Sequence, residues 1–431
     1  MITNSALKSR LVFDSEGNLI DEKSDNNNIK RIVIIALFLR ILVLIIVLLS
    51  GSFGDAFVEV SMNVDDWRYE TGGEYYSEYA RSFIDPQTFT DAYMRLGDST
   101  GHHIDKPITN ATIWYWIVCI LMYFTKTKWS VRILNVFLSS LSIVYIFRFA
   151  RLVYSKKTAI LASKLFAVLP YPVIFCCFSY KEEVALICTF YLLYRSAEFR
   201  YSHKITLSII FKMLIATLFL FGVRSGVSLI LIAICIFIMF FKDMRFIRAH
   251  FPIFLCFFGV AIVLFTFLAI RYKGIIIHKF STYLSPTYVE ETGLLQFFKI
   301  RSVKNIWRFP FTYFISVMMP LVLTSSFSSW ASIVSFLNLF CMTPIAIGAT
   351  VYAFCKKKKD PLVYWLCILY YSIYLITSLG ISRHYAALLP LSLIAFADYR
   401  VNLNEKDHKI WLVISILGII VFLADFLLSM I

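Results

Sequence analysis

Long apolar runs, separated by short polar and basic stretches, recur along almost the whole chain. The first run extends from about residue 32 to 50 and carries Arg40 as its charged residue. A hydrocarbon core about 30 Å thick needs about 20 such residues in an α-helix, and only helices or closed barrels satisfy their backbone groups in lipid. The alternating ten-residue segments of a barrel are absent from the sequence, so the pattern predicts an all-α polytopic membrane protein.

The positions of lysine and arginine predict how the chain threads the membrane, because short cytoplasmic loops carry the excess of both. Lys30-Arg31 precede the first run, so we expect residues 1–30 to form a disordered cytoplasmic tail and residues 51–130 an external loop. Within that loop, 111–125 is apolar over only about 15 residues, which is too short to cross at about 1.5 Å per residue. We therefore expect it to be a helix at the outer interface.

The same rule continues to the end of the chain and predicts a single transmembrane domain over 31–431, with a second external loop at 271–330. An interfacial or re-entrant segment is expected at 310–330. Together with the first run, we expect about 11 spans plus interfacial helices. The protein is therefore expected to be a multi-pass protein of the cell membrane with a cytoplasmic N-terminus. The remaining expected spans are 132–154, 158–178, 184–194 with its flanks, 206–222, 227–241, 252–270, 333–354, 362–379, 385–397 and 410–430.

Composition agrees with a membrane protein and argues against a nucleic-acid-binding one. The chain is 59% hydrophobic, and its net charge of +15 comes from basic clusters between apolar runs, where such clusters act as topology signals. Its nine cysteines show no CxxC spacing, so neither a disulfide framework nor a metal knuckle is indicated. We expect partners among membrane lipids and none among nucleic acids.

Under this topology, acidic and basic residues from distant parts of the chain face the same outer leaflet. Carboxylates beside an acceptor can act as a general base or position a metal, and basic groups can hold a phosphate leaving group. The predicted catalytic residues are Asp65, Asp66, Glu182 and Glu183. The predicted phosphate-binding residues are Lys106, Arg224, Arg383 and His384.

Structural roles are also open to these residues. Asp65-Asp66 begin a predicted helix that runs to Ala80, where acidic residues are favoured by the helix dipole, so a capping role is as well supported as catalysis. Glu182-Glu183 lie between two apolar runs and could terminate helices. The adjacent pair His102-His103 is weak support for a metal site, so a structural or incidental role is preferred there.

Short motifs follow one another through residues 31–200 in an order and spacing that resemble the N-terminal half of the GT-C glycosyltransferases. The lipid A aminoarabinose transferases and the protein O-mannosyltransferases are the most similar of these. A weaker likeness lies at 383–390. The motifs are Asp65-Asp66-Trp67-Arg68-Tyr69-Glu70, Lys106-Pro107 before an aromatic helix, Val131-Arg132, Arg151-Leu152 with Lys156-Lys157 and Ala159 to Ala162, and Glu182-Glu183.

This resemblance implies inverting transfer of a sugar from a polyprenyl-phosphate donor to a glycan or lipid acceptor at the extracytoplasmic face. It implies that Asp65 is the base or acceptor-positioning group, accompanied by Asp66, and that Lys106 contacts the lipid phosphate. The second acid of the family falls in the region of Glu182-Glu183, where the family usually has Asp. Some members hold a divalent metal between these acids and others need none, so the resemblance leaves the cofactor open.

Two other functions remain as alternatives. A polysaccharide polymerase of the O-antigen or capsule type also combines many spans with external basic residues. A transporter or flippase of a lipid-linked saccharide would carry ionisable residues within its spans, and Arg40, Lys164 and Lys212 do lie in apolar segments. Acidic residues concentrated in external loops favour transfer chemistry, whereas acidic residues in mid-helix favour transport.

Overall fold

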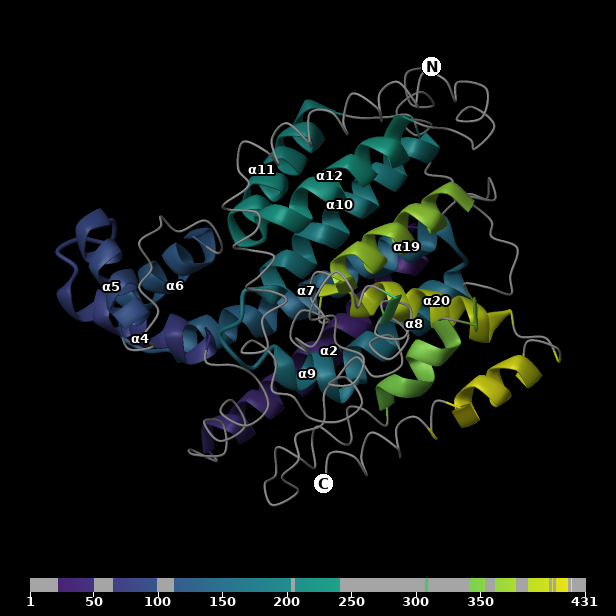
Figure 1. Ribbon diagram of the computed structural model, residues 1–431, viewed down its shortest axis with the longest axis horizontal. Coiled ribbons are helices and arrows are strands. Elements are labelled where there is room, and N and C mark those ends of the chain that lie inside the picture. The colour runs from purple at the N-terminus through teal and green to yellow at the C-terminus, as the bar shows by residue number, and fades with distance from the viewer. Residues whose placement is uncertain are drawn as a thin grey trace.

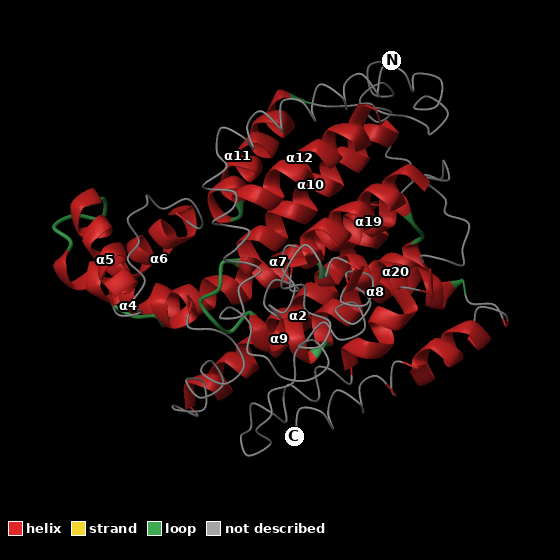
Figure 2. Ribbon diagram, viewed as in Figure 1, coloured by secondary structure: helices red, strands yellow, loops and turns green. Residues whose placement is uncertain are grey.

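The described part of the chain is helical and contains no strand (Figure 2). The computed structural model describes residues 22–49, 65–98, 112–202, 206–240, 307–308, 341–349, 351–352, 361–376, 387–402, 405, 408–417 and 420. The all-α class predicted from the sequence is therefore confirmed for these residues.

Helix α7 (Trp129–Val153) lies at the centre of a group of helices and contacts α2 (Glu22–Leu49), α8 (Lys156–Val168) and α10 (Glu182–Ser202). Helix α20 (Leu389–Val401) packs on α8 and so joins a late segment to this group. Helices α4, α5 and α6 lie together to one side (Figure 1). The other helices are α4 (Asp65–Tyr79), α5 (Pro86–Asp98), α6 (Thr112–Thr125), α9 (Pro170–Phe175), α11 (Leu207–Val223), α12 (Ser225–Phe240) and α19 (Pro361–Ile376).

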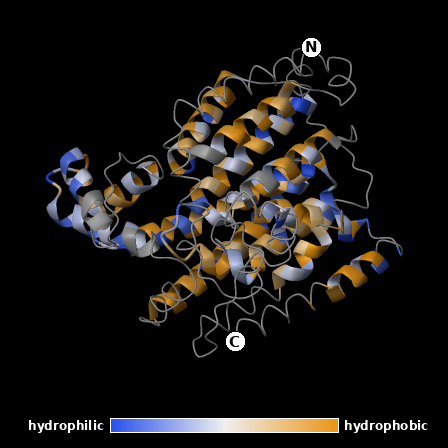
Figure 3. Cartoon of the chain, in the orientation of Figure 1, coloured by the Kyte–Doolittle hydropathy of each residue, from blue (hydrophilic) through white to orange (hydrophobic). Residues whose placement is uncertain are grey.

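Two of the described helices, α2 from Ser24 onward and α7, are long and apolar enough to cross a membrane. Shorter apolar helices include α6 and α11. Figure 3 shows hydrophobic residues over most of these helices and more polar ones on α4 and α5. The expected helix at 111–125 is confirmed as α6, whereas its position at a membrane interface stays a prediction.

Helix boundaries differ from the expected ones at two places. Helix α2 begins at Glu22, so residues 22–30 are helical rather than part of a disordered tail. The Asp25 carboxylate fixes this extension, since it lies 3.2 Å from Arg151 Nε and 2.8 Å from Lys156 Nζ. The expected single span at 158–178 is divided into α8 and α9, because Leu169 before Pro170 has the extended conformation that a following proline favours.

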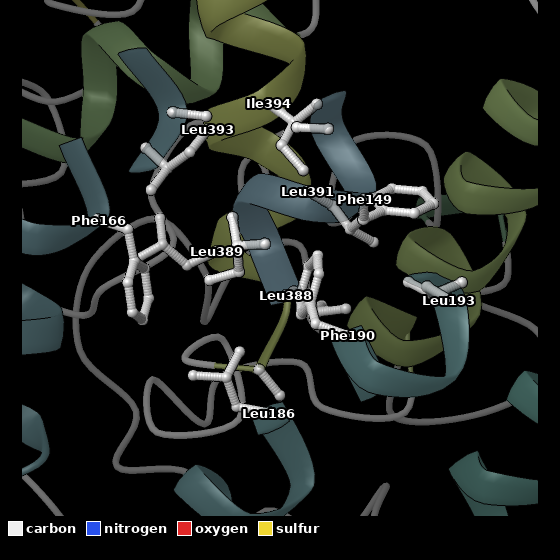
Figure 4. Close-up of a cluster of buried hydrophobic side chains, with 14 of the residues drawn as sticks. Phe149, Phe166, Leu186, Phe190, Leu193, Leu388, Leu389, Leu391, Leu393 and Ile394 are labelled. Atoms are coloured by element: carbon white, nitrogen blue, oxygen red, sulfur yellow. The ribbon is translucent and has the colours of Figure 1, made fainter. Parts of the chain in front are cut away.

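The main hydrophobic core lies where α7, α8, α10 and α20 meet (Figure 4). Phe149 and Phe190 are fully buried there, and their rings meet edge-on with centroids 6.2 Å apart. Leu389 and Leu393 of α20 are fully buried in the same core. A buried hydrogen bond of 2.9 Å from Thr158 Oγ1 to Asp398 Oδ1 also ties α8 to α20. These contacts hold the late helix rigidly against the early ones.

Helix α4 lies close against α6, and a glycine makes this approach feasible. A Cβ on Gly73 would lie 2.4 Å from Met122 Sδ and 2.9 Å from a Val118 methyl carbon. Tyr76 is fully buried in the same layer, and its hydroxyl accepts a 2.7 Å hydrogen bond from the Asp85 N–H. Burial raises the pKa of Tyr76, so its hydroxyl keeps its proton. The α4–α6 layer is thus a packed unit rather than a loose loop.

Asp85 caps α5 and gives a testable pH dependence. Its carboxylate accepts hydrogen bonds from Thr88 N, Thr88 Oγ1 and Arg81 N, at 3.1, 2.9 and 3.1 Å, and these bonds lower its pKa below 3.8. A lowered folded-state pKa stabilises the fold above the unfolded-state value, and this stabilisation is lost as the pH falls through the folded-state value. We expect Asp85→Asn to lower the unfolding temperature at pH 7, with a difference from wild type that shrinks toward pH 3.

Thermal unfolding of the purified protein across this pH range measures the effect of Asp85. Asp91→Asn is the matched control, because Asp91 is an exposed residue of the same helix. The same pH-dependent difference in both variants would contradict a specific role for the cap.

Candidate functional site

A buried ion pair joins α4 to the start of α7. Arg132 donates from Nε to Glu70 Oε1 at 2.7 Å and from Nη2 to Glu70 Oε2 at 2.8 Å. Ser179 Oγ donates to the same Oε1 at 2.6 Å, and Lys128 Nζ lies 3.5 Å from Oε2. Glu70 is 4% exposed and Arg132 is 3% exposed. A bidentate pair of this kind fixes both position and orientation, so α4 is clamped to the helix group around α7.

The segment that leads into α10 is fixed by side chains from two other helices. Asn135 Nδ2 of α7 donates to Phe178 O at 2.6 Å and to Tyr180 O at 2.8 Å. Trp114 Nε1 of α6 donates to Ser179 O at 3.0 Å. These bonds satisfy the backbone carbonyls of a buried turn and hold the first turn of α10 next to the Glu70–Arg132 pair.

Glu182 begins α10 and pairs with Arg224, which stands between α11 and α12. Arg224 Nη2 donates to Glu182 Oε1. Glu182 is 1% exposed, and its Oε2 has no hydrogen-bond partner among the residues that the structure describes. The backbone N–H of Arg224 bonds to Leu220 O as α11 ends, and this break in the helix directs Arg224 to the carboxylate. Helices α10 and α11 therefore present one carboxylate and one guanidinium to each other.

Glu183 is also buried in the helix group, near Arg40 of α2. Burial raises the pKa of Glu183 well above its usual range, and the positive charge of Arg40 acts in the opposite direction. Arg40 Nε donates to Ser139 Oγ at 3.2 Å. In the described part of the chain, the Oε2 atom of Glu183 has no hydrogen-bond partner. Both acids lie in the first turn of α10, where the helix dipole stabilises negative charge.

Three of the eight predicted site residues are described with their side chains, namely Glu182, Glu183 and Arg224, and the structure pairs Glu182 with Arg224. Asp65 and Asp66 are the first two residues of α4, which confirms that they begin a helix, and their side chains lie outside the described part. Position 66 precedes Glu70 by about one helical turn. Lys106, Arg383 and His384 lie outside the described residues.

The sequence interpretation gave no role to Ser179 and Lys128, and it used Glu70 and Arg132 only as parts of motifs. A signal for Glu70 and Arg132 does exist in the sequence. Arg132 begins the expected span at 132–154, where an ionisable residue needs a partner of opposite charge. Glu70 stands four residues after Asp66 and is therefore on the same side of the helix.

The clustered groups are of the kinds used in acid–base and phosphate chemistry. Within the described residues, no group of three or more His, Cys, Asp or Glu side chains could hold a metal ion. Three carboxylates and three guanidiniums gather where α4, α7 and α10 meet: Glu70 with Arg132, Glu182 with Arg224, and Glu183 near Arg40. No protein-family model matches the chain, and no curated protein is detectably similar to it.

Proposed function

We propose that this chain is a multi-pass membrane glycosyltransferase that moves a sugar from a polyprenyl-phosphate donor to a glycan or lipid acceptor at the extracytoplasmic face. The observation that carries the proposal is the clamp between α4 and the starts of α7 and α10. Through Glu70, Arg132 and Ser179, it fixes the helix that begins with Asp65-Asp66 beside the two acids of α10.

The transfer reaction needs a proton acceptor and a phosphate-binding cation within one site. The acceptor hydroxyl attacks the anomeric carbon, its new bond to that carbon forms, and the bond from carbon to the phosphate oxygen breaks. The hydroxyl proton passes to a carboxylate, for which we propose Asp65 with Asp66. Lys106, Arg224, Arg383 and His384 are proposed to stabilise the polyprenyl phosphate that leaves. Glu182 and Glu183 supply the second acidic position.

We propose about 11 spans, and the apolar surface of the described helices supports a location in the membrane. Large apolar side chains point outward from α2 and α11, where Phe38 is 69% exposed and Leu207 is 82% exposed. Contiguous exposed apolar surface of this kind is costly in water and normal in lipid. Along α7, Arg132 and Arg151 are separated by 19 residues, or about 28 Å of helix, which is close to the thickness of a hydrocarbon core.

A transporter or flippase of lipid-linked saccharide is the second candidate, because Arg40 is fully buried within a helix long enough to span a membrane. Its guanidinium donates to Phe166 O and Ala167 O, each at 3.1 Å, and to Ser139 Oγ. These bonds to the end of α8 give Arg40 a structural role in joining α2 to α8. Transfer at the α4–α10 site therefore remains the better supported function.

The proposed function is tested in cells that carry either the wild-type protein or the Asp65→Asn, Asp66→Asn double variant at matched membrane abundance. We expect the variant to lose one sugar addition from the surface glycan or lipid while its lipid-linked donor accumulates. A polymerase would instead lose long chains and keep single repeat units.

An unchanged glycan profile in the double variant would overturn the proposed role of Asp65 and Asp66 and leave them as a helix cap. Glu78→Gln, an exposed acid of the same helix, is the matched control and should leave the profile unchanged.

A further inference from the structure

A second polar site lies at the other end of α7, about 28 Å along the helix from Arg132. It is a cavity of about 190 Å³ between the first turns of α2, the last turns of α7 and the second half of α10. Its lining residues are Asp25, Asn26, Ile29, Phe147, Arg148, Arg151, Leu152, Tyr194, Arg195 and Glu198.

Three arginines and two carboxylates line this cavity, and the carboxylates are already paired. Asp25 lies against Arg151 and Lys156, at 3.2 and 2.8 Å. Glu198 accepts from Arg195 Nη1 and, at 2.8 Å, from the Tyr194 hydroxyl. The cavity thus has an excess of positive charge after its internal pairs are counted.

Arg148 supplies that excess. Within the described part of the chain it has no carboxylate partner, and its guanidinium lies over the Tyr194 ring, 5.7 Å from the centroid. The ring restricts the side chain and leaves its N–H groups available to a ligand in the cavity. Arg148 is half-buried in the body of a helix, which distinguishes it from the exposed loop arginines that only set topology.

Arg195 adds an unsatisfied donor to the same cavity. Its Nε is buried and has no hydrogen-bond partner among the described residues, while its guanidinium carbon lies 4.9 Å from the centroid of the Tyr194 ring. A buried N–H without an acceptor costs free energy, so a bound acceptor would stabilise the site. The cavity also borders the first turns of α2, where the helix dipole favours an anion.

We propose that this cavity binds a phosphate monoester, held by Arg148 and Arg195 at the end of the helix group opposite the carboxylate site. Arginine suits this ligand because its planar fork of donors matches the phosphate oxygens. Asp25 and Glu198 would repel the anion if they were free, and their pairing with Arg151, Lys156 and Arg195 removes most of that repulsion. The phosphate site does not depend on the transfer reaction proposed above.

Calorimetric titration of the full-length protein in neutral detergent tests the site, with dihexanoyl phosphatidic acid and inorganic phosphate as separate probes. We expect saturable binding of the phosphatidic acid and an affinity lowered about tenfold or more by Arg148→Gln, since a charge-assisted hydrogen bond is lost. Arg81→Gln removes an exposed arginine from the α4–α5 connection and should leave the affinity within about twofold.

Two further variants keep the test decisive if Arg148→Gln does not fold. Arg148→Lys should retain part of the affinity because it keeps the charge, and Arg195→Lys should weaken binding because it removes the unpartnered Nε donor. If inorganic phosphate binds with the same dependence on Arg148, that result would support the site and identify free phosphate, rather than a lipid headgroup, as its ligand. Absence of saturable binding by either probe, or equal affinity in Arg148→Gln and wild type, would overturn the proposal.

Discussion

Replacement of Arg132 by methionine should lower the free energy of unfolding by about 3–5 kcal/mol, because it leaves the Glu70 carboxylate buried without its bidentate partner. Ser179 still donates one hydrogen bond, and Lys128 is too distant at 3.5 Å to replace a paired guanidinium. Chemical unfolding of the purified protein in mixed detergent measures the change.

The double variant Glu70→Gln, Arg132→Met should recover much of that loss, because it removes the uncompensated charge together with its partner. The coupling between the two positions follows from the double-mutant cycle. Lys128→Met is the control and should cost at most about 1 kcal/mol, since the Lys128 side chain is 32% exposed. Equal losses in the single and double variants would contradict the clamp.

Glu183→Gln should lower sugar transfer by about 100-fold or more while the protein remains folded. The substitution keeps the size of the side chain and replaces an ionisable carboxyl group near Arg40 with a neutral amide. A carboxylate that serves acid–base or electrostatic chemistry contributes at least this much, whereas a helix-terminating residue contributes nothing to the rate. The transfer rate and the unfolding temperature are measured on the same preparations.

Glu78→Gln is the matched control for Glu183→Gln, because it makes the same chemical change at an exposed position of α4. It should leave both rate and stability unchanged. If Glu183→Gln transfers sugar at the wild-type rate, Glu183 has a structural role only. If it lowers stability and rate together, the loss of rate follows from unfolding.

The apolar runs were enough to predict most described helices, because their lengths and the basic residues between them mark where helices begin and end. The expected segments at 206–222 and 227–241 correspond to α11 (Leu207–Val223) and α12 (Ser225–Phe240). The extension of α2 to Glu22 was not predictable in this way, because its cause is a contact of Asp25 with residues more than a hundred positions later.

Part of the candidate site followed from residue chemistry and part required tertiary structure. Glu182 and Arg224 were both singled out as external charged residues, and the structure brings them into contact. The sequence did not predict that they pair with each other, because Glu182 was assigned to catalysis and Arg224 to phosphate binding. Glu70 and Arg132 stand 62 positions apart, and only the tertiary placement of α4, which packs on α6, brings them together.

The most direct test of the central claim is a transfer assay on the purified protein in lipid nanodiscs, supplied with a lipid extract from cells that lack it. Such cells should accumulate the lipid-linked donor. Mass spectrometry should then show the donor converted to polyprenyl phosphate by the wild-type protein, and conversion reduced by about 100-fold or more in Asp65→Asn, Asp66→Asn and in Glu183→Gln. No conversion by the wild type, or equal conversion by the variants, would contradict a glycosyltransferase with this site.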